Sequence, residues 1–310
     1  RDLMPHSAKN TLPEQHRVDV LILAAGSGSR FDAITPKQFA AIDGKTVLHH
    51  ACLSFARWQN CSSITICYPE NGLSTAHASL LDVIEAESNI TLHRVAGGSR
   101  RDISVLLGLR HIRQRADTST GLVMIHDSAR PFVPETVLNR LLASFPHDEK
   151  DPRGVIPVMP VIDTIKSVSE QIVKVTMDRE SLVRVQTPQL FRLTALLDLH
   201  EAHAAIPDKG QPRITDDASL VEQAGGLVMT VKGDKALEKI TYAEDILKLS
   251  ASESLKSEDG NTSLLLPRFA TGYDVHKFSD ITPGPIMICG VAVPHEVNVT
   301  SHSDGDVGLH

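Results

Sequence analysis

The sequence predicts an α/β fold, in which a mostly parallel, Rossmann-like sheet carries helices on both faces. Two observations favour this class. Short apolar runs of strand length alternate with stretches whose apolar spacing is helical, and the first run leads into a glycine-rich turn. Hydrophobic residues make up 41% of the 310 residues, which is enough for a substantial core.

The expected elements follow one another in βα order. The apolar runs that we interpret as strands are Val18–Leu23, Ser63–Tyr68, Ile90–Val95, Gly121–His126, Gly154–Val158 and Leu227–Val231. The stretches that we interpret as helices are Thr46–Trp58, Leu73–Glu85, Arg101–Arg115, Pro134–Phe145, Thr194–Ala205, Asp216–Ala224 and Tyr242–Ser250. The segment Ile162–Met177 breaks this order with two alternating runs joined by a turn, which predicts a β-arm outside the main sheet.

Changes in composition predict four segments. Residues 1–17 form a polar, disordered tail, and residues 18–250 form the α/β domain. Residues 251–266 form a linker, because the stretch Ser250–Ser263 is small, polar and charged. Residues 267–310 begin a second domain, and its roughly 45 residues are near the lower limit for an independent fold.

The bulk properties exclude several classes of function. The net charge of −7 argues against broad nucleic-acid binding. No run of about 18 apolar residues predicts a membrane span, and the polar N-terminus lacks the apolar core of a signal peptide. The four cysteines form no CxxC pair, which predicts reduced thiols and a cytoplasmic location.

The turn after the first strand has the pattern of a phosphate site. Its sequence is AAGSGSR, ending at Arg30, and Pro36-Lys37-Gln38 follows. Glycines let the backbone approach an oxyanion closely, and its free amides can point at the anion. A Walker loop needs Lys and Ser or Thr after its last glycine, and Phe31 stands where a dinucleotide fingerprint needs a third small residue. A plain βα turn is the alternative interpretation.

The pattern AAGSGSR-x5-PKQF resembles the nucleotide signature of the 2-C-methyl-D-erythritol 4-phosphate cytidylyltransferase family, and the similarity continues through most of residues 18–250. The further matching segments are Gly97–Arg101 with Ser104, His126–Pro131, Asp163-Thr164, Asp178-Arg179, Thr187–Gln189, Thr215–Asp217 and Glu238–Thr241. Many family members carry Asp where this chain has Ser99. The resemblance implies a nucleotidyltransferase-type fold and transfer of CMP from CTP to methylerythritol phosphate, with release of pyrophosphate. The protein then has to position two anions and stabilise charge, without a covalent nucleophile.

The resemblance also implies roles for individual residues. The catalytic residues are Arg30, Lys37, Arg179 and Lys239. The nucleotide-binding residues are Ala24, Ala25, Gly26, Gly28, Gly98, Ser99 and Ser104. Methylerythritol phosphate is held by Arg130, Thr164, Arg179, Thr187 and Lys239, several of which the family takes from a neighbouring subunit through the β-arm, so a dimer is expected. Asp127 is the expected Mg²⁺ ligand, although on spacing alone an Asp after a strand is more typical of a helix cap.

The second segment carries a candidate metal site. Asp274 and His276 are two residues apart on an apparently extended stretch, so both can reach one metal ion. A dense His/Asp cluster, HSDGDVGLH, ends at His310. Two imidazoles and a carboxylate suit Zn²⁺ or another divalent metal, and a metal-free surface cluster is the alternative.

The same segment resembles the start of the 2-C-methyl-D-erythritol 2,4-cyclodiphosphate synthase family, through GYDVHKF, ICGVAVPH and HSDGDVGLH. The resemblance implies the beginning of an α+β domain, a trimeric assembly and formation of a cyclic diphosphate with release of CMP. Asp274, His276 and His310 correspond to metal ligands, and His302 and Ser303 to a loop that binds the substrate phosphate. Roughly the last two-thirds of that family's domain lies beyond this sequence, so the parent protein rather than this fragment is expected to cyclise the substrate.

Three other functions remain as alternatives. The first is cytidylyl transfer to another polyol phosphate, such as ribitol 5-phosphate. The motifs of residues 18–250 distinguish this reaction poorly from transfer to methylerythritol phosphate. The second is a nicotinamide-dependent oxidoreductase, against which Phe31 and the pair Arg30 and Lys37 argue. The third is a nucleotide-binding module without catalysis, in which replacing Lys37 by Ala leaves the role intact.

Overall fold

The computed structural model describes residues 17–26, 36–69, 75–88, 90–115, 121–146, 152–207, 214–242, 244–246, 277–278, 284–288, 291–296 and 299–300. The chain divides into two compact units, Arg1–Lys256 and Ser257–His310. The expected tail lies outside the described residues except for Arg17, and the expected linker, residues 251–266, lies wholly outside them. Tyr242 and residues 244–246 are the described part of the helix expected over residues 242–250.

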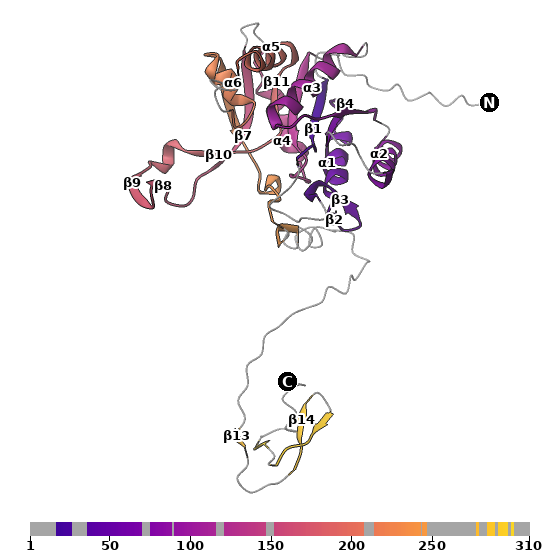
Figure 1. Cartoon of the computed structure of the whole chain (residues 1–310), viewed down its shortest axis with the longest axis vertical. Coiled ribbons are helices and arrows are strands. Elements are labelled where there is room, and N and C mark those ends of the chain that lie inside the picture. The colour runs from indigo at the N-terminus through magenta and orange to yellow at the C-terminus, as the bar shows by residue number, and fades with distance from the viewer. Residues whose placement is uncertain are drawn as a thin grey trace, which may run out of the picture. The chain divides into compact units, whose positions relative to one another are not determined.

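The first unit is built on an eight-stranded mixed sheet, in the part of the chain that the structure describes (Figure 1). Its strands are β1 (Val18–Leu23), β4 (Cys61–Tyr68), β5 (Leu92–Ala96), β6 (Leu122–Asp127), β7 (Arg153–Pro160), β10 (Val183–Val185), β11 (Gln189–Arg192) and β12 (Leu227–Lys232). The central order is β5-β4-β1-β6, all parallel. Strand β11 then runs antiparallel between β6 and β7, while β12 pairs in parallel with β7.

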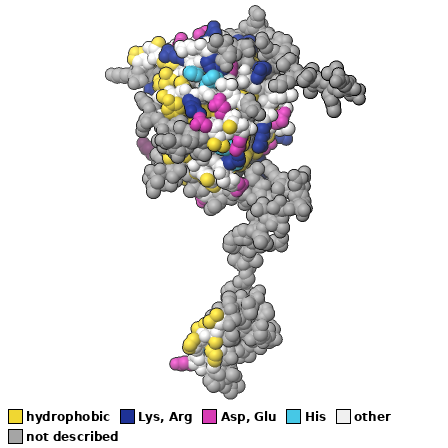
Figure 2. All heavy atoms as spheres, turned by 90° about the vertical axis from the view of Figure 1, so that its right-hand side faces the viewer, with side chains coloured by type: hydrophobic (Ala, Val, Ile, Leu, Met, Phe, Trp, Pro, Cys, Tyr) yellow, Lys and Arg dark blue, Asp and Glu magenta, His cyan; other side chains and the backbone are white. Residues whose placement is uncertain are grey.

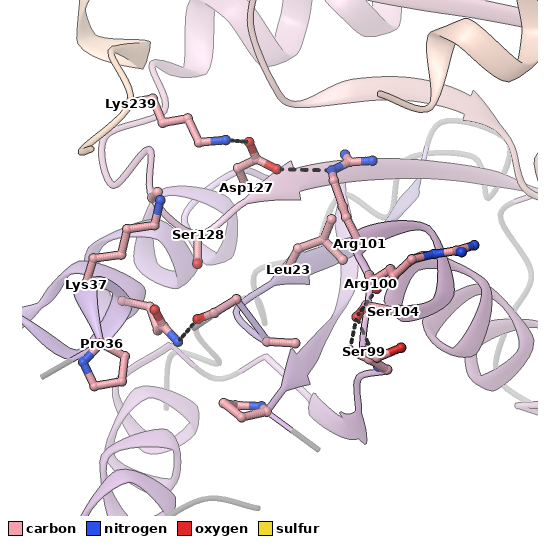
Figure 3. Close-up of a pocket in the computed structure, with 16 residues that line it drawn as sticks. Leu23, Pro36, Lys37, Ser99, Arg100, Arg101, Ser104, Asp127, Ser128 and Lys239 are labelled. Carbon is pink, nitrogen blue, oxygen red and sulfur yellow. Dashed lines mark hydrogen bonds and ion pairs between the residues drawn. The ribbon is translucent and has the colours of Figure 1, made fainter. Parts of the chain in front are cut away.

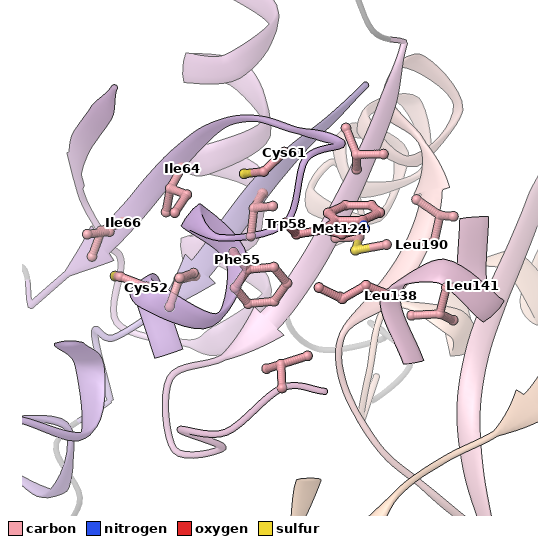
Figure 4. Packing of buried hydrophobic residues seen from close by; sticks show 14 of the residues in the cluster. Cys52, Phe55, Trp58, Cys61, Ile64, Ile66, Met124, Leu138, Leu141 and Leu190 are labelled. Carbon is pink, nitrogen blue, oxygen red and sulfur yellow. The ribbon is translucent and has the colours of Figure 1, made fainter. Parts of the chain in front are cut away.

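Helices cover both faces of this sheet. They are α1 (Val47–Ala56), α2 (Thr75–Ser88), α3 (Arg101–Gln114), α4 (Glu135–Ala143), α5 (Leu193–Ala204) and α6 (Ala218–Gln223). Side chains alternate along a strand, so β1 sends Val20 and Ile22 to one buried cluster and Leu21 to the other. The first cluster includes residues of α1, α2 and α4, among them Phe55 (Figure 4), and the second includes residues of α3, α5 and α6.

The expected α/β class is confirmed, and so are its predicted strands and its predicted helices between residues 46 and 224, within the described residues. The ends differ by a few residues; for example, the first helix begins at Val47, because the Thr46 side chain caps it by accepting from the amide of His49 at 3.2 Å. Strands β10 and β11 were not predicted. Each is only three or four residues long, and pairing with β7 and β6 rather than local sequence defines them.

The predicted β-arm is also present. Strands β8 (Lys166–Ser169) and β9 (Ile172–Thr176) pair with each other and project from the body of the unit (Figure 1). Glu170 and Gln171 between them have φ values of 51° and 65°, the positive pair that a tight hairpin turn uses. All residues of both strands are exposed.

Smaller elements complete the description. Strands β2 (Ala41–Ile42) and β3 (Lys45–Thr46) form a short hairpin. The described part of the chain also contains the 3₁₀ turns η2 (Lys37–Phe39), η3 (Arg179–Ser181) and η5 (Lys235–Leu237). In the second unit, β13 (Lys277–Phe278) pairs with β16 (Val299–Thr300), and β14 (Ile286–Ile288) pairs with β15 (Val291–Val293). Among the described residues, no helix has the length and apolar character needed to cross a bilayer.

The face of the molecule shown in Figure 2 carries Lys and Arg side chains scattered among Asp and Glu side chains. Among the described residues of this face, the two signs of charge are mixed, as on an ordinary solvated surface.

Candidate active site

The strand order places a cavity at the carboxyl ends of the parallel strands. From β1 the chain moves outward through β4 to β5, and then returns through α3 to β6 on the other side of β1. Open α/β sheets bind ligands outside the strand ends where the direction of winding reverses. A cavity of about 640 Å³ lies there, lined by the ends of β1 and β6, the β5–α3 loop, η2 and Lys239 (Figure 3).

One wall of the cavity is the start of the glycine turn. Ala25 and Gly26 line it, and Ala24 is buried behind them. Gln38, itself buried, donates from Nε2 to the carbonyls of Ala24 at 2.8 Å and Gly26 at 3.0 Å. The Pro36-Lys37-Gln38 segment therefore fixes the path of the turn, and the Lys37 side chain reaches the cavity from the same segment (Figure 3).

The opposite wall is the loop between β5 and α3. Ser104, on the first turn of α3, accepts at Oγ from the amide of Gly98 at 3.1 Å and donates to the carbonyl of Arg100 at 3.0 Å. Gly97 lies against Ala25 so closely that a Cβ on Gly97 would be 2.5 Å from the Ala25 Cβ. The two walls of the cavity are thus in direct contact at their base.

Asp127 ends β6 and points into the cavity between two cations (Figure 3). Lys239 Nζ donates to Oδ2 at 2.6 Å, and Arg101 Nε lies 3.6 Å from Oδ1. Burial alone would raise the pKa of the Asp127 carboxyl, but the charges of Arg101 and Lys239 outweigh burial and hold this pKa well below its ordinary value. Asp127 is therefore a carboxylate at neutral pH.

Arg101 has a second carboxylate partner behind the cavity. Its Nη2 donates to Asp217 Oδ2 at 2.7 Å, and His200 Nε2 lies 3.0 Å from Asp217 Oδ1. Burial would raise the pKa of Asp217, but the Arg101 charge and the His200 hydrogen bond lower it to about 2. Burial would likewise lower the pKa of Arg101, and its two carboxylate neighbours instead raise it above its ordinary value.

Beneath Asp127, a buried imidazole orders the backbone. His126 Nε2 lies 2.9 Å from the carbonyl of Arg130, so Nε2 is the protonated nitrogen, and Thr187 Oγ1 donates to Nδ1 at 3.1 Å. The same Thr187 oxygen accepts from the amide of Asp127 at 3.1 Å. Burial lowers the pKa of His126 to about 4, so the ring is neutral. Arg130 Nη1 donates to the carbonyl of Leu237, which ties the segment before Lys239 to this layer.

The structure brings most of the described candidate residues to one cavity. Ala25, Gly26, Lys37, Gly98, Ser99, Ser104, Asp127 and Lys239 all line it. Thr187 and Arg130 lie behind Asp127 and are not among the lining residues. Thr164 and Arg179 lie at the base of the arm, where both are exposed and Arg179 Nη1 donates to the carbonyl of Ile162 at 3.1 Å. Gly28 and Arg30 lie outside the described residues.

Sequence reasoning gave no role to four residues that build this site: Gln38, Arg101, Ser128 and Asp217. Gln38, Arg101 and Ser128 line the cavity, and Asp217 is fully buried behind Arg101. All four lie inside or beside the motif segments, so the motifs marked their positions without indicating their roles. Their contacts join positions up to 116 residues apart, which spacing along one sequence does not reveal.

The residues present fit a magnesium ion at the first site. Mg²⁺ is commonly held by one or two carboxylates together with substrate phosphates and water, and Asp127 supplies one ionised carboxylate at the cavity wall. Within the described ranges no group of three or more His, Cys, Asp or Glu side chains could form an all-protein metal cage. The candidate ligands of the second metal, Asp274, His276 and His310, and the loop residues His302 and Ser303, lie outside the described residues.

Comparison with known proteins agrees with the two sequence resemblances. Residues 18–253 match the family 2-C-methyl-D-erythritol 4-phosphate cytidylyltransferase (IspD), and residues 267–310 match the YgbB family. The bifunctional enzyme IspD/IspF of Granulibacter bethesdensis is 35% identical over 95% of this chain and 69% of its own length. The protein of the same name from Paramagnetospirillum magneticum is 37% identical over 94% of this chain and 68% of its own length.

A solved structure shares the fold of the first unit. The crystal structure of 2-C-methyl-D-erythritol 4-phosphate cytidylyltransferase from Thermus thermophilus superposes with a TM-score of 0.59 and 26% identity. It covers 77% of this chain and 99% of the other. With the two family matches and the bifunctional relatives, this likeness shows that the chain belongs to the 2-C-methyl-D-erythritol 4-phosphate cytidylyltransferase family, joined to a YgbB-family segment.

Proposed function

We propose that the first unit transfers CMP from CTP to 2-C-methyl-D-erythritol 4-phosphate, giving 4-diphosphocytidyl-2-C-methyl-D-erythritol and pyrophosphate. The observation that carries this proposal is the cavity at the ends of β1, β5 and β6. There a glycine turn, the cations Lys37 and Lys239, and the ionised Asp127 face one another in a chain of the cytidylyltransferase family.

In the proposed reaction, a phosphate oxygen of the acceptor attacks the α-phosphorus of CTP, and the bond to pyrophosphate breaks. Lys37, Lys239 and Arg30 stabilise the negative charge on the phosphoryl oxygens, and the backbone at Gly26 admits the phosphates closely. Burial raises the pKa of each described cysteine, to about 12 for Cys52 and Cys67 and likewise upward for Cys61, so none of the three is a nucleophile at neutral pH. The direct transfer needs none.

Asp127 would hold Mg²⁺ together with phosphate oxygens of the nucleotide. When bound, the ion neutralises phosphate charge and orients the triphosphate. The chain's own contribution is to keep Asp127 ionised, through Lys239 and Arg101, and aimed into the cavity, through the hydrogen bond that its backbone N–H donates to Thr187 Oγ1. Ala25, Gly26, Gly98, Ser99 and Ser104 would bind the nucleoside and its phosphates.

Methylerythritol phosphate would be held by Arg130, Thr164, Arg179, Thr187 and Lys239, with the arm reaching a neighbouring subunit. The physical support for a dimer is the set of exposed apolar side chains on the arm, among which Val168, Ile172 and Val173 are 57%, 60% and 53% exposed. Sedimentation of the full chain tests this proposal. A dimer that the double substitution Ile172→Lys and Val173→Lys converts to monomer supports it, and a wild-type monomer contradicts it.

For the second unit, we propose that the parent protein closes a 2,4-cyclodiphosphate and releases CMP, with Zn²⁺ or another divalent metal held by Asp274, His276 and His310. His302 and Ser303 would bind the substrate phosphate. Metal analysis of the full-length parent tests the ligand set. Asp274→Ala should lose the bound metal, and an unchanged metal content removes Asp274 from the set.

The first activity is tested by pyrophosphate release from CTP and Mg²⁺ with either methylerythritol phosphate or ribitol 5-phosphate as acceptor. We expect release only with methylerythritol phosphate, and none when UTP, ATP or GTP replaces CTP. Release with ribitol 5-phosphate alone would contradict the assignment. Lys37→Ala distinguishes an enzyme from a binding module. An enzyme should lose pyrophosphate release while its structure is preserved, whereas a binding module should keep its role unchanged.

A further inference from the structure

Behind the cavity, a chain of polar groups runs from α5 to Asp127. His200 on α5 is bonded to Asp217, which lies at the start of α6, and Asp217 accepts from Arg101 at the start of α3. His200 is 1% exposed and Asp217 is 0% exposed, so neither can touch a substrate in the cavity. Arg101 links them to the cavity, where its Nε faces Asp127.

The two cations that flank Asp127 are held very differently. Both oxygens of Asp217 are occupied, one by Arg101 and one by His200, so the Arg101 guanidinium has a fixed partner on its inner side. The distances reflect this: Arg101 is 2.7 Å from Asp217 and 3.6 Å from Asp127. Lys239 makes a short bond of 2.6 Å to Asp127, but its side chain is 43% exposed on a flexible stem.

We propose that Asp217 and His200 are positioning residues that hold Arg101 as the permanent counter-ion of Asp127, whereas Lys239 is the exchangeable one. On entry of a divalent cation with the nucleotide, Lys239 leaves Asp127 and moves to the substrate phosphates, and Arg101 stays. This inference rests on the function proposed above, because it assigns Asp127 to the cation and Lys239 to the phosphates.

The energetic reason is the location of Asp217. Moving Arg101 away would leave the Asp217 carboxylate buried without its cation, which is strongly unfavourable. Moving Lys239 away breaks one charge-assisted hydrogen bond at a partly exposed site. Asp127 then has the divalent cation as its new partner, and Lys239 has the substrate phosphates. Asp217 also restrains Arg101 from closing fully on Asp127, because Arg101 lies 2.7 Å from Asp217 but 3.6 Å from Asp127 Oδ1.

Binding of Mn²⁺ alone to the full chain, followed by electron paramagnetic resonance or water proton relaxation without nucleotide, tests this directly. The signal that Asp127→Asn abolishes defines the site and separates it from any metal bound by the second unit. Lys239→Met should bind Mn²⁺ at least about threefold more tightly, because the competing ammonium group is gone. Asp217→Asn should bind it about tenfold more weakly, because Arg101 is then released onto Asp127.

A double-mutant comparison shows whether Asp217 acts through Arg101. In an Arg101→Gln background, adding Asp217→Asn should change Mn²⁺ affinity less than twofold, since the residue it positions is already absent. The double variant leaves neither Arg101 nor the Asp217 carboxylate without its partner, whereas Arg101→Gln alone leaves Asp217 buried without its cation. If either single variant does not fold, the double variant is compared directly with the wild type: Mn²⁺ binding at least as tight as in the wild type supports the proposal, because no guanidinium competes for Asp127, and a loss of about tenfold or more overturns it. Glu201→Gln is the matched control. It removes the exposed Arg110–Glu201 bond of 3.0 Å between the same helices, α3 and α5, and should leave Mn²⁺ affinity unchanged.

The outcomes separate the two proposals. Equal effects of Asp217→Asn with and without Arg101, or Mn²⁺ binding by Lys239→Met that is no tighter than wild type, would overturn the positioning proposal. Wild-type protein that releases no pyrophosphate from CTP and methylerythritol phosphate would instead overturn the proposed function, whatever the order of the Mn²⁺ affinities.

Discussion

Gly97 offers a quantitative test of how the cavity is built. A Cβ at this position would lie 2.5 Å from the Ala25 Cβ, 2.8 Å from Ser104 Oγ and 3.1 Å from the carbonyl oxygen of Tyr68. The first and third of these atoms belong to parts of the chain that cannot rotate away. Replacing Gly97 with Ala therefore forces the β5–α3 loop and the turn after β1 apart.

The size of the displacement follows from van der Waals distances. Carbon atoms in contact prefer about 3.5–4.0 Å, so relieving the contact with Ala25 requires a shift of about 1 Å. A misplacement of that size in a reacting site can reduce the rate about 100-fold. Inserting a methyl group into a packed region also destabilises the fold, here by about 1–3 kcal/mol.

The assay is kcat/KM for CTP from pyrophosphate release, together with the midpoint of thermal unfolding. Gly26→Ala is the matched comparison, since a Cβ there has no neighbour within 4 Å and the residue lines the same cavity. We expect Gly97→Ala to lose both stability and activity, and Gly26→Ala to keep its unfolding midpoint while losing CTP affinity. A wild-type value of kcat/KM in Gly97→Ala would refute the idea that contact between the two walls determines the shape of the cavity.

Three further predictions concern the cation, the core and the pH. Lys37→Ala should lower kcat/KM for CTP at least about 100-fold with an unchanged unfolding midpoint, and a loss below tenfold would remove Lys37 from the transition state. Phe55→Ala should reduce the free energy of unfolding by about 3–5 kcal/mol, since Phe55 is fully buried against His126, and denaturant titration measures this. His126 has a folded-state pKa of about 4, below the ordinary value of 6.5. Between pH 6.5 and pH 4 the unfolded chain therefore binds a proton at this residue that the folded chain does not. The free energy of unfolding falls as the pH drops through this range, by about 3 kcal/mol for this group. His126→Gln should flatten that part of the stability–pH curve, and an identical curve would contradict the buried neutral imidazole.

The strands that position the site were predictable because their own residues encode them. Apart from the buried Asp19, the run from Val18 to Leu23 is apolar on both sides, as is typical of a central parallel strand, and helices cover it on both faces. The glycine turn and Lys37 follow it closely in sequence, so their common location could be inferred. Asp127 could be placed at the same edge because it ends another such strand.

The contacts between distant segments were not predictable from one sequence. Strand β11 is four residues long and antiparallel to its neighbours β6 and β7, and only its position between them makes it a strand. Gln38 was visible in its motif, but its bonds to the carbonyls of Ala24 and Gly26 depend on how η2 folds back on β1. The pairing of Arg101 with Asp217 joins two helices that the sequence separates by 116 positions.

Gly97 shows the same limit in another form. The sequence indicates a glycine pair before α3, and backbone flexibility would be the usual explanation. The structure gives a different reason, because no Cβ fits between the loop and Ala25. Such a requirement arises from the approach of two loops and has no local signature.

The most direct measurement of the central claim is a crystal structure of the full chain with CTP and Mg²⁺. We predict the triphosphate between the turn at Gly26 and Lys37, with Mg²⁺ on Asp127 and the nucleoside against Gly98 and Ser104. Nucleotide density that avoids this cavity, or a triphosphate remote from both Lys37 and Asp127, would contradict the assignment of the site.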